Sequence, residues 1–285
     1  MEQSDYVALS HRDIVRDGKG DSMEQDTIRQ VLEIAIYSGR VMLENGAETY
    51  RVEETINRIC ASQNIHVESF VIPTGIFVSY NHEAKDYSYV RRIRNIHIDL
   101  AAIGMVNDFS RNFVAGKIPL DDAKSKLDQI RYAPRFSAPL VILFGGLSGG
   151  FFTLLFGGTF FEFIAAFLVS LGVMTASTIM TKKSKSSFMR NLVGGIVNGI
   201  LALFSVATLV FLGITANIDM IIIGSIMPLV PGVAITNAIR DLIYGDYVAG
   251  MSKLSEALLV AAAIAIGVGI VLQLNLLISG GLYVY

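Results

Sequence analysis

Long apolar stretches in the second half of the chain constrain its fold more than any other feature. A helix that crosses a membrane needs about 20 consecutive, mostly apolar residues. Pro228 and Pro231 interrupt the fourth and shortest of the stretches found here. The sequence therefore predicts an all-α membrane domain of five transmembrane helices within residues 136–285, at about Ala138–Phe156, Phe160–Met180, Leu192–Leu212, Met220–Ile235 and Ala257–Ile278.

The distribution of charge agrees with this division. Residues 136–285 carry only six of the 23 Lys and Arg residues and five of the 25 Asp and Glu residues. Residues 1–25 are polar without an apolar period, so we expect a disordered tail there. Residues 26–135 combine amphipathic helical patterns with short β-branched runs. We therefore expect a small α+β domain over 26–135, with helices from Asp26 to Asn45 and over Ala47–Gln63, Ile98–Ala115 and Leu120–Ile130, and strands over His66–Ile72, Gly75–Tyr80 and Tyr87–Ile93.

Basic residues flank the apolar stretches on one side only. Arg131 and Arg135 precede the first stretch, four basic residues separate the second from the third, and Arg240 and Lys253 separate the fourth from the fifth. The two remaining loops contain no Lys or Arg. Loops on the cytoplasmic side carry an excess of Lys and Arg. We therefore predict a multi-pass protein of the cytoplasmic (inner) membrane, with its N-terminus in the cytoplasm and its C-terminus outside.

Composition argues against several classes of function. One cysteine and four scattered histidines suggest neither a disulfide framework nor a metal site. A net charge of −2 provides no basic surface for nucleic acid. No glycine-rich Walker loop occurs, which argues against ATP hydrolysis by this chain. We expect no cofactor, no bound metal and no nucleic-acid partner.

The segment Met227–Gly232 is the most informative part of the apolar half. Two prolines and a glycine should break a helix, because proline lacks a backbone N–H and clashes with the preceding turn. Non-helical backbone at membrane depth persists only where protein or a water-filled cavity surrounds it. Transporters use such breaks to direct half-helix ends at a substrate or an ion. A kink that only shapes packing is the equally weighted alternative.

Small and polar residues within the apolar stretches leave two interpretations open. Glycines four apart, at Gly145 and Gly149 and at Gly195 and Gly199, lie on one helix face and allow close helix packing. That face packs either within the chain or against a partner subunit. Polar residues in these stretches also allow two interpretations: they contact a polar solute, or they bridge helices. They are Asn198, Ser205, Thr208 and Asn237.

A cluster of charge marks the second predicted helix of the soluble domain. Glu54 and Arg58 are four residues apart and should pair on the solvent side. Arg51 could hold a carboxylate, from a neighbouring Glu or from a substrate. Charge on an exposed helix face is more often simply solvated, so a solvated face is the favoured explanation of this cluster. Cys60 adjoins the apolar stripe and is expected to be buried and unreactive.

Three blocks of sequence resemble one protein family. They are Asn45–Thr55 (NGAETYRVEET), Pro73–Ile76 (PTGI), and Met227–Gly232 followed by Asn237, Arg240-Asp241, Gly245-Asp246 and Gly250. In this order they resemble the threonine/serine exporter family over about residues 26–272. The resemblance singles out a cytoplasmic-domain motif of Glu48, Arg51, Glu54, Pro73 and Thr74. Together with the helix break it suggests a substrate-binding or translocation site at Pro228, Pro231, Gly232, Asn237, Arg240 and Asp241.

Full-length members of that family carry a second membrane region. The chain resembles the larger subunit of the split, two-chain form, which works with a small membrane partner of four or five spans. One split pair in the family is associated with succinate export, whereas fused members export threonine and serine. The resemblance thus implies a non-enzymatic subunit of a secondary-active exporter of amino acids or C4-dicarboxylates. A membrane-anchored enzyme or a scaffold acting through the soluble domain is the alternative.

Overall fold

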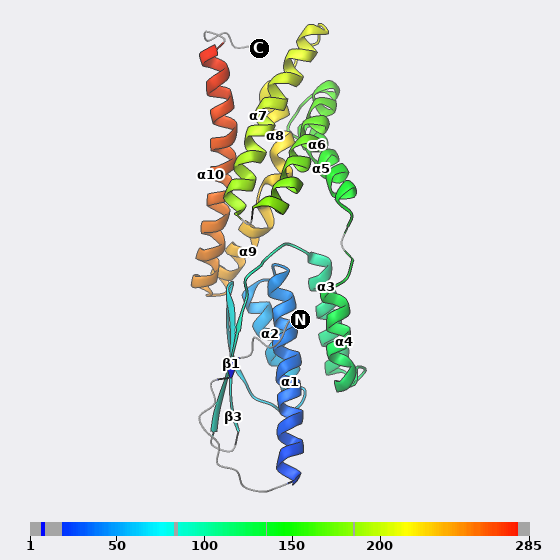
Figure 1. The fold of residues 1–285 in the computed structure, drawn as a ribbon, viewed down its shortest axis with the longest axis vertical. Coiled ribbons are helices and arrows are strands. Elements are labelled where there is room, and N and C mark those ends of the chain that lie inside the picture. The colour runs from blue at the N-terminus through cyan, green and yellow to red at the C-terminus, as the bar shows by residue number, and fades with distance from the viewer. Residues whose placement is uncertain (1–6, 9–18, 83–84, 135, 185, 279–285) are drawn as a thin grey trace. The chain divides into compact units, whose positions relative to one another are not determined.

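The computed structural model describes residues 7–8, 19–82, 85–134, 136–184 and 186–278 (Figure 1). Contacts within the chain define two compact units. The N-terminal unit consists of Met1–Pro134 together with Val233–Leu254, and the membrane unit consists of Arg135–Gly232 together with Ser255–Tyr285. The sequence had suggested one boundary near residue 135. Val233–Leu254 join the N-terminal unit instead, and polar side chains such as Asn237 and Lys253 bond to it.

The N-terminal unit combines helices with one antiparallel sheet, as the α+β pattern predicts. Its sheet has the strand order β1-β4-β3-β2. β2 and β3 form a hairpin in which Ile72 pairs with Gly75, so Pro73-Thr74 is a two-residue turn. The elements are β1 (Val7–Ala8), α1 (Lys19–Glu44), α2 (Thr49–Ala61), β2 (Glu68–Ile72), β3 (Gly75–His82), β4 (Lys85–Arg92), α3 (Leu100–Val114), α4 (Leu120–Arg131) and α9 (Gly232–Ile243).

The predicted tail is where prediction and structure differ most in this unit. α1 begins at Lys19, so it includes residues that were assigned to a tail over 1–25. The first turns of α1 are mostly polar and therefore carry no apolar period. Val7 and Ala8 pair with Val90 and Tyr89 of β4. The other residues of the predicted tail lie outside the described residues.

The core of the N-terminal unit lies between helices α1 to α4 and one face of the sheet. Val52, Ile56 and Ile59 of α2 are fully buried, which confirms the predicted apolar stripe. A Cβ at Gly39 of α1 would lie 2.7 Å from Ile56 Cδ1, so a glycine lets the two helices approach closely. Cys60 is also buried, and burial raises the pKa of its thiol to about 12.

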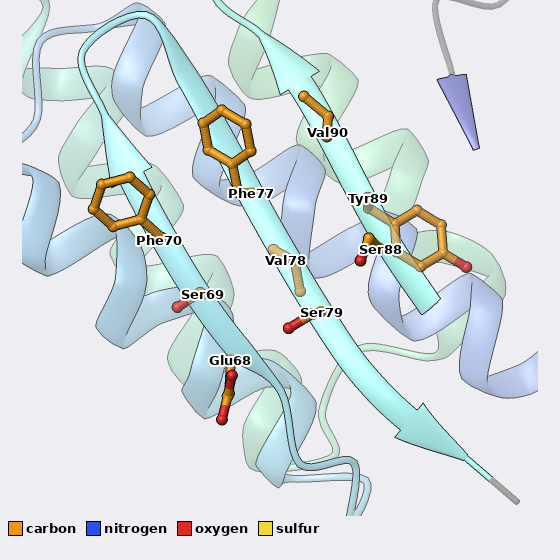
Figure 2. A pocket seen from close by; sticks show the side chains of 9 residues that line it. All are labelled: Glu68, Ser69, Phe70, Phe77, Val78, Ser79, Ser88, Tyr89 and Val90. Atoms are coloured by element: carbon orange, nitrogen blue, oxygen red, sulfur yellow. The ribbon is translucent and has the colours of Figure 1, made fainter. Parts of the chain in front are cut away.

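The opposite face of the sheet is open and partly apolar. Phe70, Phe77 and Val90 stand opposite one another on β2, β3 and β4 and are exposed. They border a shallow hollow of about 340 Å³ whose rim includes Ser79 and Ser88, with helices behind the sheet (Figure 2). The alternation along these strands therefore separates a buried face from an exposed one.

The membrane unit is helical. Four helices are long and apolar enough to cross a membrane, or five if the interrupted pair Ile218–Leu229 and Gly232–Ile243 counts as one span. The structure thus supports four to five spans rather than five continuous helices. The elements are α5 (Ala138–Leu155), α6 (Phe160–Lys183), α7 (Ser187–Phe211), α8 (Ile218–Ile226), the 3₁₀ turn η1 (Met227–Leu229) and α10 (Tyr247–Ile278), whose first two turns belong to the N-terminal unit.

The prolines break the chain as the sequence predicts. α8 ends at Ile226, η1 contains Pro228, and α9 begins at Gly232. Val230, between the two short helical pieces, has extended backbone.

Glycines at helix crossings pack within the chain. A Cβ at Gly195 of α7 would lie 2.6 Å from the carbonyl oxygen of Ile264 in α10. A Cβ at Gly267 of α10 would lie 2.5 Å from the carbonyl oxygen of Leu192. Gly149 of α5 approaches α6 in the same way, at Ser170. Of the two interpretations of these glycines, contact inside one subunit is the one that this structure contains.

Candidate functional site

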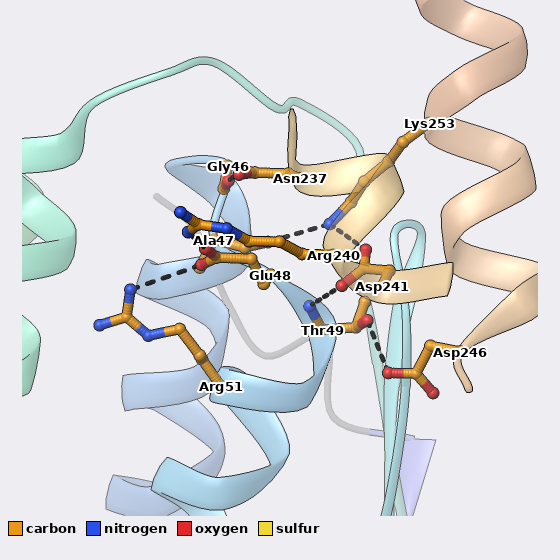
Figure 3. Close-up of polar contacts among 10 residues, drawn as sticks. All are labelled: Gly46, Ala47, Glu48, Thr49, Arg51, Asn237, Arg240, Asp241, Asp246 and Lys253. Carbon is orange, nitrogen blue, oxygen red and sulfur yellow. Dashed lines mark hydrogen bonds and ion pairs between the residues drawn. The ribbon is translucent and has the colours of Figure 1, made fainter. Parts of the chain in front are cut away.

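The turn between α1 and α2 leaves backbone groups that need partners. α1 ends at Glu44 and α2 begins at Thr49, and Gly46 adopts a φ of +85°, which favours glycine. Residues from α9 and from the start of α10 bond to this turn (Figure 3). The Asn237 side-chain amide donates to the Gly46 carbonyl at 2.9 Å, and the Lys253 ammonium donates to the Ala47 carbonyl at 3.2 Å.

Asp241 occupies the N-terminus of α2. Its Oδ1 accepts the backbone N–H of Thr49 at 3.2 Å, and Glu48 provides no side-chain cap of its own. The first N–H groups of a helix lack partners within the helix and attract negative charge. A carboxylate from α9, 192 residues further along the chain, therefore caps α2.

Ion pairs surround this capped helix end. Arg240 Nη1 lies 2.6 Å from Glu48 Oε1, and Arg51 Nη1 lies 3.5 Å from Glu48 Oε2. Lys253 Nζ lies 2.7 Å from Asp241 Oδ2. The Thr49 hydroxyl donates to Asp246 Oδ2 at 3.0 Å. We call this set the ion-pair network: Glu48, Thr49, Arg51, Asn237, Arg240, Asp241, Asp246 and Lys253.

The network has a buried centre and a solvent-facing edge. Asp241 is fully buried, and Glu48 and Asn237 are nearly so. The Arg240 and Arg51 side chains are 52% and 36% exposed. Two guanidinium groups therefore flank one buried carboxylate and remain accessible on their outer sides.

Two glutamates of the loop and helix α2 have pKa values displaced in opposite directions. Burial raises the pKa of Glu48, but hydrogen bonding to its own backbone N–H and to Arg240, with the charges of Arg51 and Arg240, outweighs burial, so the pKa is lowered. Burial raises the pKa of Glu53, and the charges of Asp246 and Asp241 raise it further against the Val71 N–H bond.

Opposite pH dependences should follow at these two positions. The lowered pKa of Glu48 gives stability that is present above its ordinary value and lost as pH falls toward the lowered value. The raised pKa of Glu53 gives stability that is present below its ordinary value and lost as pH rises through the raised value. We expect the stability difference between the parent and Glu48→Gln to grow in the parent's favour from pH 3 to pH 6. Over the same pH range, Glu53→Gln should gain stability relative to the parent.

Thermal unfolding followed by circular dichroism measures both differences, since the chain contains no tryptophan for fluorescence. Each variant serves as the control for the other, because both remove one carboxylate from neighbouring positions. Parallel pH profiles for the parent and both variants would contradict the displaced pKa values.

Spacing within α9 makes Asn237 a neighbour of both Arg240 and Asp241. Asp241 lies four residues after Asn237 and Arg240 lies three after it, and these are the separations at which side chains meet on a helix. Beside them, the rings of Tyr50 and Tyr244 stack with centroids 4.1 Å apart. A Cβ at Gly250 would lie 2.9 Å from the Ala238 carbonyl, so the turn into α10 is closely packed.

The structure brings together five of the residues that the sequence analysis selected, and separates the others. Glu48, Arg51, Asn237, Arg240 and Asp241 all belong to the network. Asp241 pairs with Lys253, and Arg240 pairs with Glu48. Outside the network, Glu54 pairs at the surface with Arg58 as predicted, Pro73 and Thr74 form the hairpin turn, and Pro228, Pro231 and Gly232 lie in the membrane unit.

Three network residues were not selected from the sequence. Thr49 and Asp246 stand inside the motif blocks, so their position was a usable signal. Lys253 precedes the last apolar stretch and looked only like a flanking charge. Its role depends on the three-dimensional proximity of Asp241 and Ala47, which no spacing in the sequence reveals.

Among the described residues, no group of His, Cys, Asp and Glu is arranged to hold a metal ion. The charged members of the network instead consist of three carboxylates, two guanidinium groups and one ammonium group. Such an arrangement can cap a helix, hold two segments together and exchange one carboxylate partner for another. The apolar helices define a multi-pass membrane protein, and the polar network lies in its N-terminal unit.

Comparison with known proteins identifies the family. The family model described as "Putative threonine/serine exporter" matches residues 33–275. The chain therefore belongs to the threonine/serine exporter family.

Two curated relatives are similar at the same level. The "Threonine/serine exporter" of Corynebacterium glutamicum is 22% identical over 260 residues, covering 90% of this chain and 53% of that protein. The "Probable threonine/serine exporter" of Mycobacterium tuberculosis (strain ATCC 25618 / H37Rv) is 22% identical over 250 residues, covering 86% of this chain and 46% of that protein. The chain spans about half the length of these relatives. No solved structure matches it.

Proposed function

We propose that this protein takes part in secondary-active export of small polar amino acids, of the threonine/serine type, across the cytoplasmic membrane. The observation that carries the proposal is the family match over residues 33–275, which includes both the soluble domain and the apolar helices. The names of the two relatives state the same substrate class for those proteins.

The exposed guanidinium groups give this proposal a chemical basis. Arg240 and Arg51 flank Glu48 and keep outer N–H groups accessible. A planar guanidinium can bind a carboxylate in bidentate fashion. The carboxylate of an amino acid would compete there with Glu48 and reach a site on the soluble side of the protein.

The broken helix provides the second element of the proposed path. Pro228 and Pro231 withdraw two N–H donors from the apolar segment, and the backbone at Val230 is extended. Unpaired backbone groups at membrane depth require polar surroundings. We infer that Pro228, Pro231 and Gly232 line the translocation path in the membrane unit, and that Asn237, Arg240 and Asp241 form its cytoplasmic entrance.

A second membrane unit belongs to this proposal. An odd number of spans allows two such units to form an inverted pair, a recurrent design among secondary transporters. The strong asymmetry of Lys and Arg disfavours insertion of identical chains in opposite orientations. We propose a separate four- or five-span partner, with the N-terminus of this chain in the cytoplasm and its C-terminus outside. C4-dicarboxylates such as succinate are the alternative substrates, since they share the carboxylate.

Export assays with labelled serine, threonine and succinate test the proposal. Arg240→Gln, Pro228→Ala and Pro231→Ala should each lose most of the export while keeping normal abundance in the membrane. Arg58→Gln is the matched control, because it removes an Arg that lies outside the network and pairs with exposed Glu54. The control should export normally.

Export that falls only in proportion to abundance would make the break and the network structural features. Unchanged export in all variants would instead favour a scaffold role for the N-terminal unit. Export of succinate without serine or threonine would overturn the proposed amino-acid substrate.

A further inference from the structure

A second polar cluster lies in the membrane unit, at the end of α8. Ser225 of α8, Asn198 of α7 and Ser170 of α6 are all fully buried. The Asn198 amide donates to Ser225 Oγ at 2.6 Å, and Ser225 Oγ donates to the Ile221 carbonyl at 2.5 Å. Ser170 Oγ donates to the Ser225 backbone carbonyl at 2.9 Å. Three helices therefore meet through polar groups one residue before α8 ends.

The side-chain oxygen of Asn198 has no hydrogen-bond partner among the described residues, although it is buried. The orientation of its amide follows from the bonds around it. With the Ser225 hydroxyl donating to the Ile221 carbonyl, Ser225 Oγ accepts from the Asn198 nitrogen, which leaves the Asn198 oxygen on the other side. A buried acceptor without a donor costs about 1–3 kcal/mol. Such a group in a native protein calls for an explanation.

The cluster offers acceptors to a ligand and has few donors to spare. Besides Asn198 Oδ1, the last carbonyls of α8 lie at a helix C-terminus, which carries partial negative charge. Half-helix C-terminal ends and unwound carbonyls bind cations in transporters with broken helices. A compact group that carries positive charge and N–H donors matches this set of oxygens.

The space around the cluster restricts the size of that group. A Cβ at Gly149 of α5 would lie 1.8 Å from Ser170 Oγ, and a Cβ at Gly224 of α8 would lie 1.8 Å from Thr153 Oγ1. Backbone of α5 and α8 therefore packs directly against the hydroxyl groups. Only a small group fits between these closely packed helices.

We propose that Asn198 Oδ1 and the C-terminal end of α8 at Ser225 form a binding site for a compact cationic group. The ammonium group of the exported amino acid is the occupant that fits the proposed function, on which this inference rests. A small inorganic cation shares the same chemistry and is the second source. The site is separate from the ion-pair network, which lies in the N-terminal unit.

The variant Asn198→Leu separates binding from folding. Leucine keeps a similar volume and removes the unpaired oxygen, while Ser225 keeps its bond to Ile221. The variant should therefore be at least as stable as the parent. The hydrogen bond to a charged group that it loses corresponds to about 10- to 150-fold in affinity. Ser205→Ala is the control, because Ser205 lies on the same helix and its hydroxyl donates to the Leu201 carbonyl of its own helix.

Thermal shifts of the purified full chain in detergent, with L-serine, L-threonine, NaCl or KCl, identify the ligand. We expect the shift caused by serine or threonine to disappear in Asn198→Leu and to persist in Ser205→Ala, with export falling in parallel. If the variant loses only a shift caused by Na⁺ or K⁺, the site exists and binds an inorganic cation.

Unchanged shifts and unchanged export in Asn198→Leu would overturn the site while leaving the proposed function intact. A parent protein that exports neither amino acid would instead overturn the proposed function. In that case a salt-dependent shift that Asn198→Leu abolishes would still support a cation site, and a shift that persists would overturn it.

Discussion

Asp241→Ala should destabilise the N-terminal unit by about 3–5 kcal/mol, the range measured when one partner of a buried ion pair is removed. Asp241 is fully buried and pairs with Lys253, whose side chain is only 13% exposed. Its loss leaves the Lys253 ammonium without that carboxylate and the Thr49 N–H without its acceptor. The same side chain thus supports both a charge and a helix end.

The single cysteine of the chain allows the destabilisation to be measured in the N-terminal unit alone. Cys60 is buried in the N-terminal core, so a thiol-reactive fluorogenic dye labels it only when that core opens. Glu54→Ala is the control, since the Glu54–Arg58 pair is exposed and such a pair contributes about 0.3–0.5 kcal/mol. The midpoint of Cys60 labelling as the core unfolds is compared between Asp241→Ala and Glu54→Ala. Equal midpoints would show that the buried pair contributes no more than a surface pair.

Gly195→Ala should destabilise the membrane unit by about 1–3 kcal/mol, the usual cost of adding atoms to a well-packed core. The added Cβ would lie 2.6 Å from the Ile264 carbonyl and 3.3 Å from Gly267 Cα. Both are backbone atoms, which cannot rotate away as the end of a flexible side chain can. α7 and α10 would have to separate, and neighbouring contacts would be lost.

Gly269→Ala is the matched control for this change. Gly269 lies on α10 close to the same crossing. Apart from the nearby backbone of α10 itself, no heavy atom of the described residues lies within 4 Å of a Cβ added there. Alanine there should be neutral or stabilising by up to about 1 kcal/mol, through helix propensity. The test measures the thermal stability of each variant in detergent and its abundance in the membrane. An equally stable Gly195→Ala would show that the two helices are loosely packed.

Local patterns were sufficient for most elements of the fold. Two β-branched runs, His66–Ile72 and Gly75–Tyr80, predicted a strand pair that the structure contains, and the stripe Val52, Ile56 and Ile59 predicted a buried helix face. The prolines predicted the end of α8. Each of these signals depends on residues within one or two turns of each other, which is the range over which sequence periodicity is informative.

Two features could not be inferred in this way. The assignment of Val233–Leu254 to the N-terminal unit follows from bonds such as Asn237 to Gly46, which join residues 191 positions apart. The pairing of Asp241 with Lys253 required knowing which of several nearby cations faces it. The family resemblance and the helix break singled out Arg240 and Asp241, but tertiary contacts decide the partner of each.

The long separation between the two sides of the ion-pair network has a consequence for synthesis. Thr49 leaves the ribosome 192 residues before Asp241, which at 5–20 residues per second is an interval of roughly 10–40 s. During that interval the part of the N-terminal unit before residue 135 can collapse around its own apolar core. The start of α2 still lacks its Asp241 cap and is open to water. The last contacts of the N-terminal unit can form only after most of the apolar helices have been synthesised. We therefore expect membrane insertion to begin before this unit is complete.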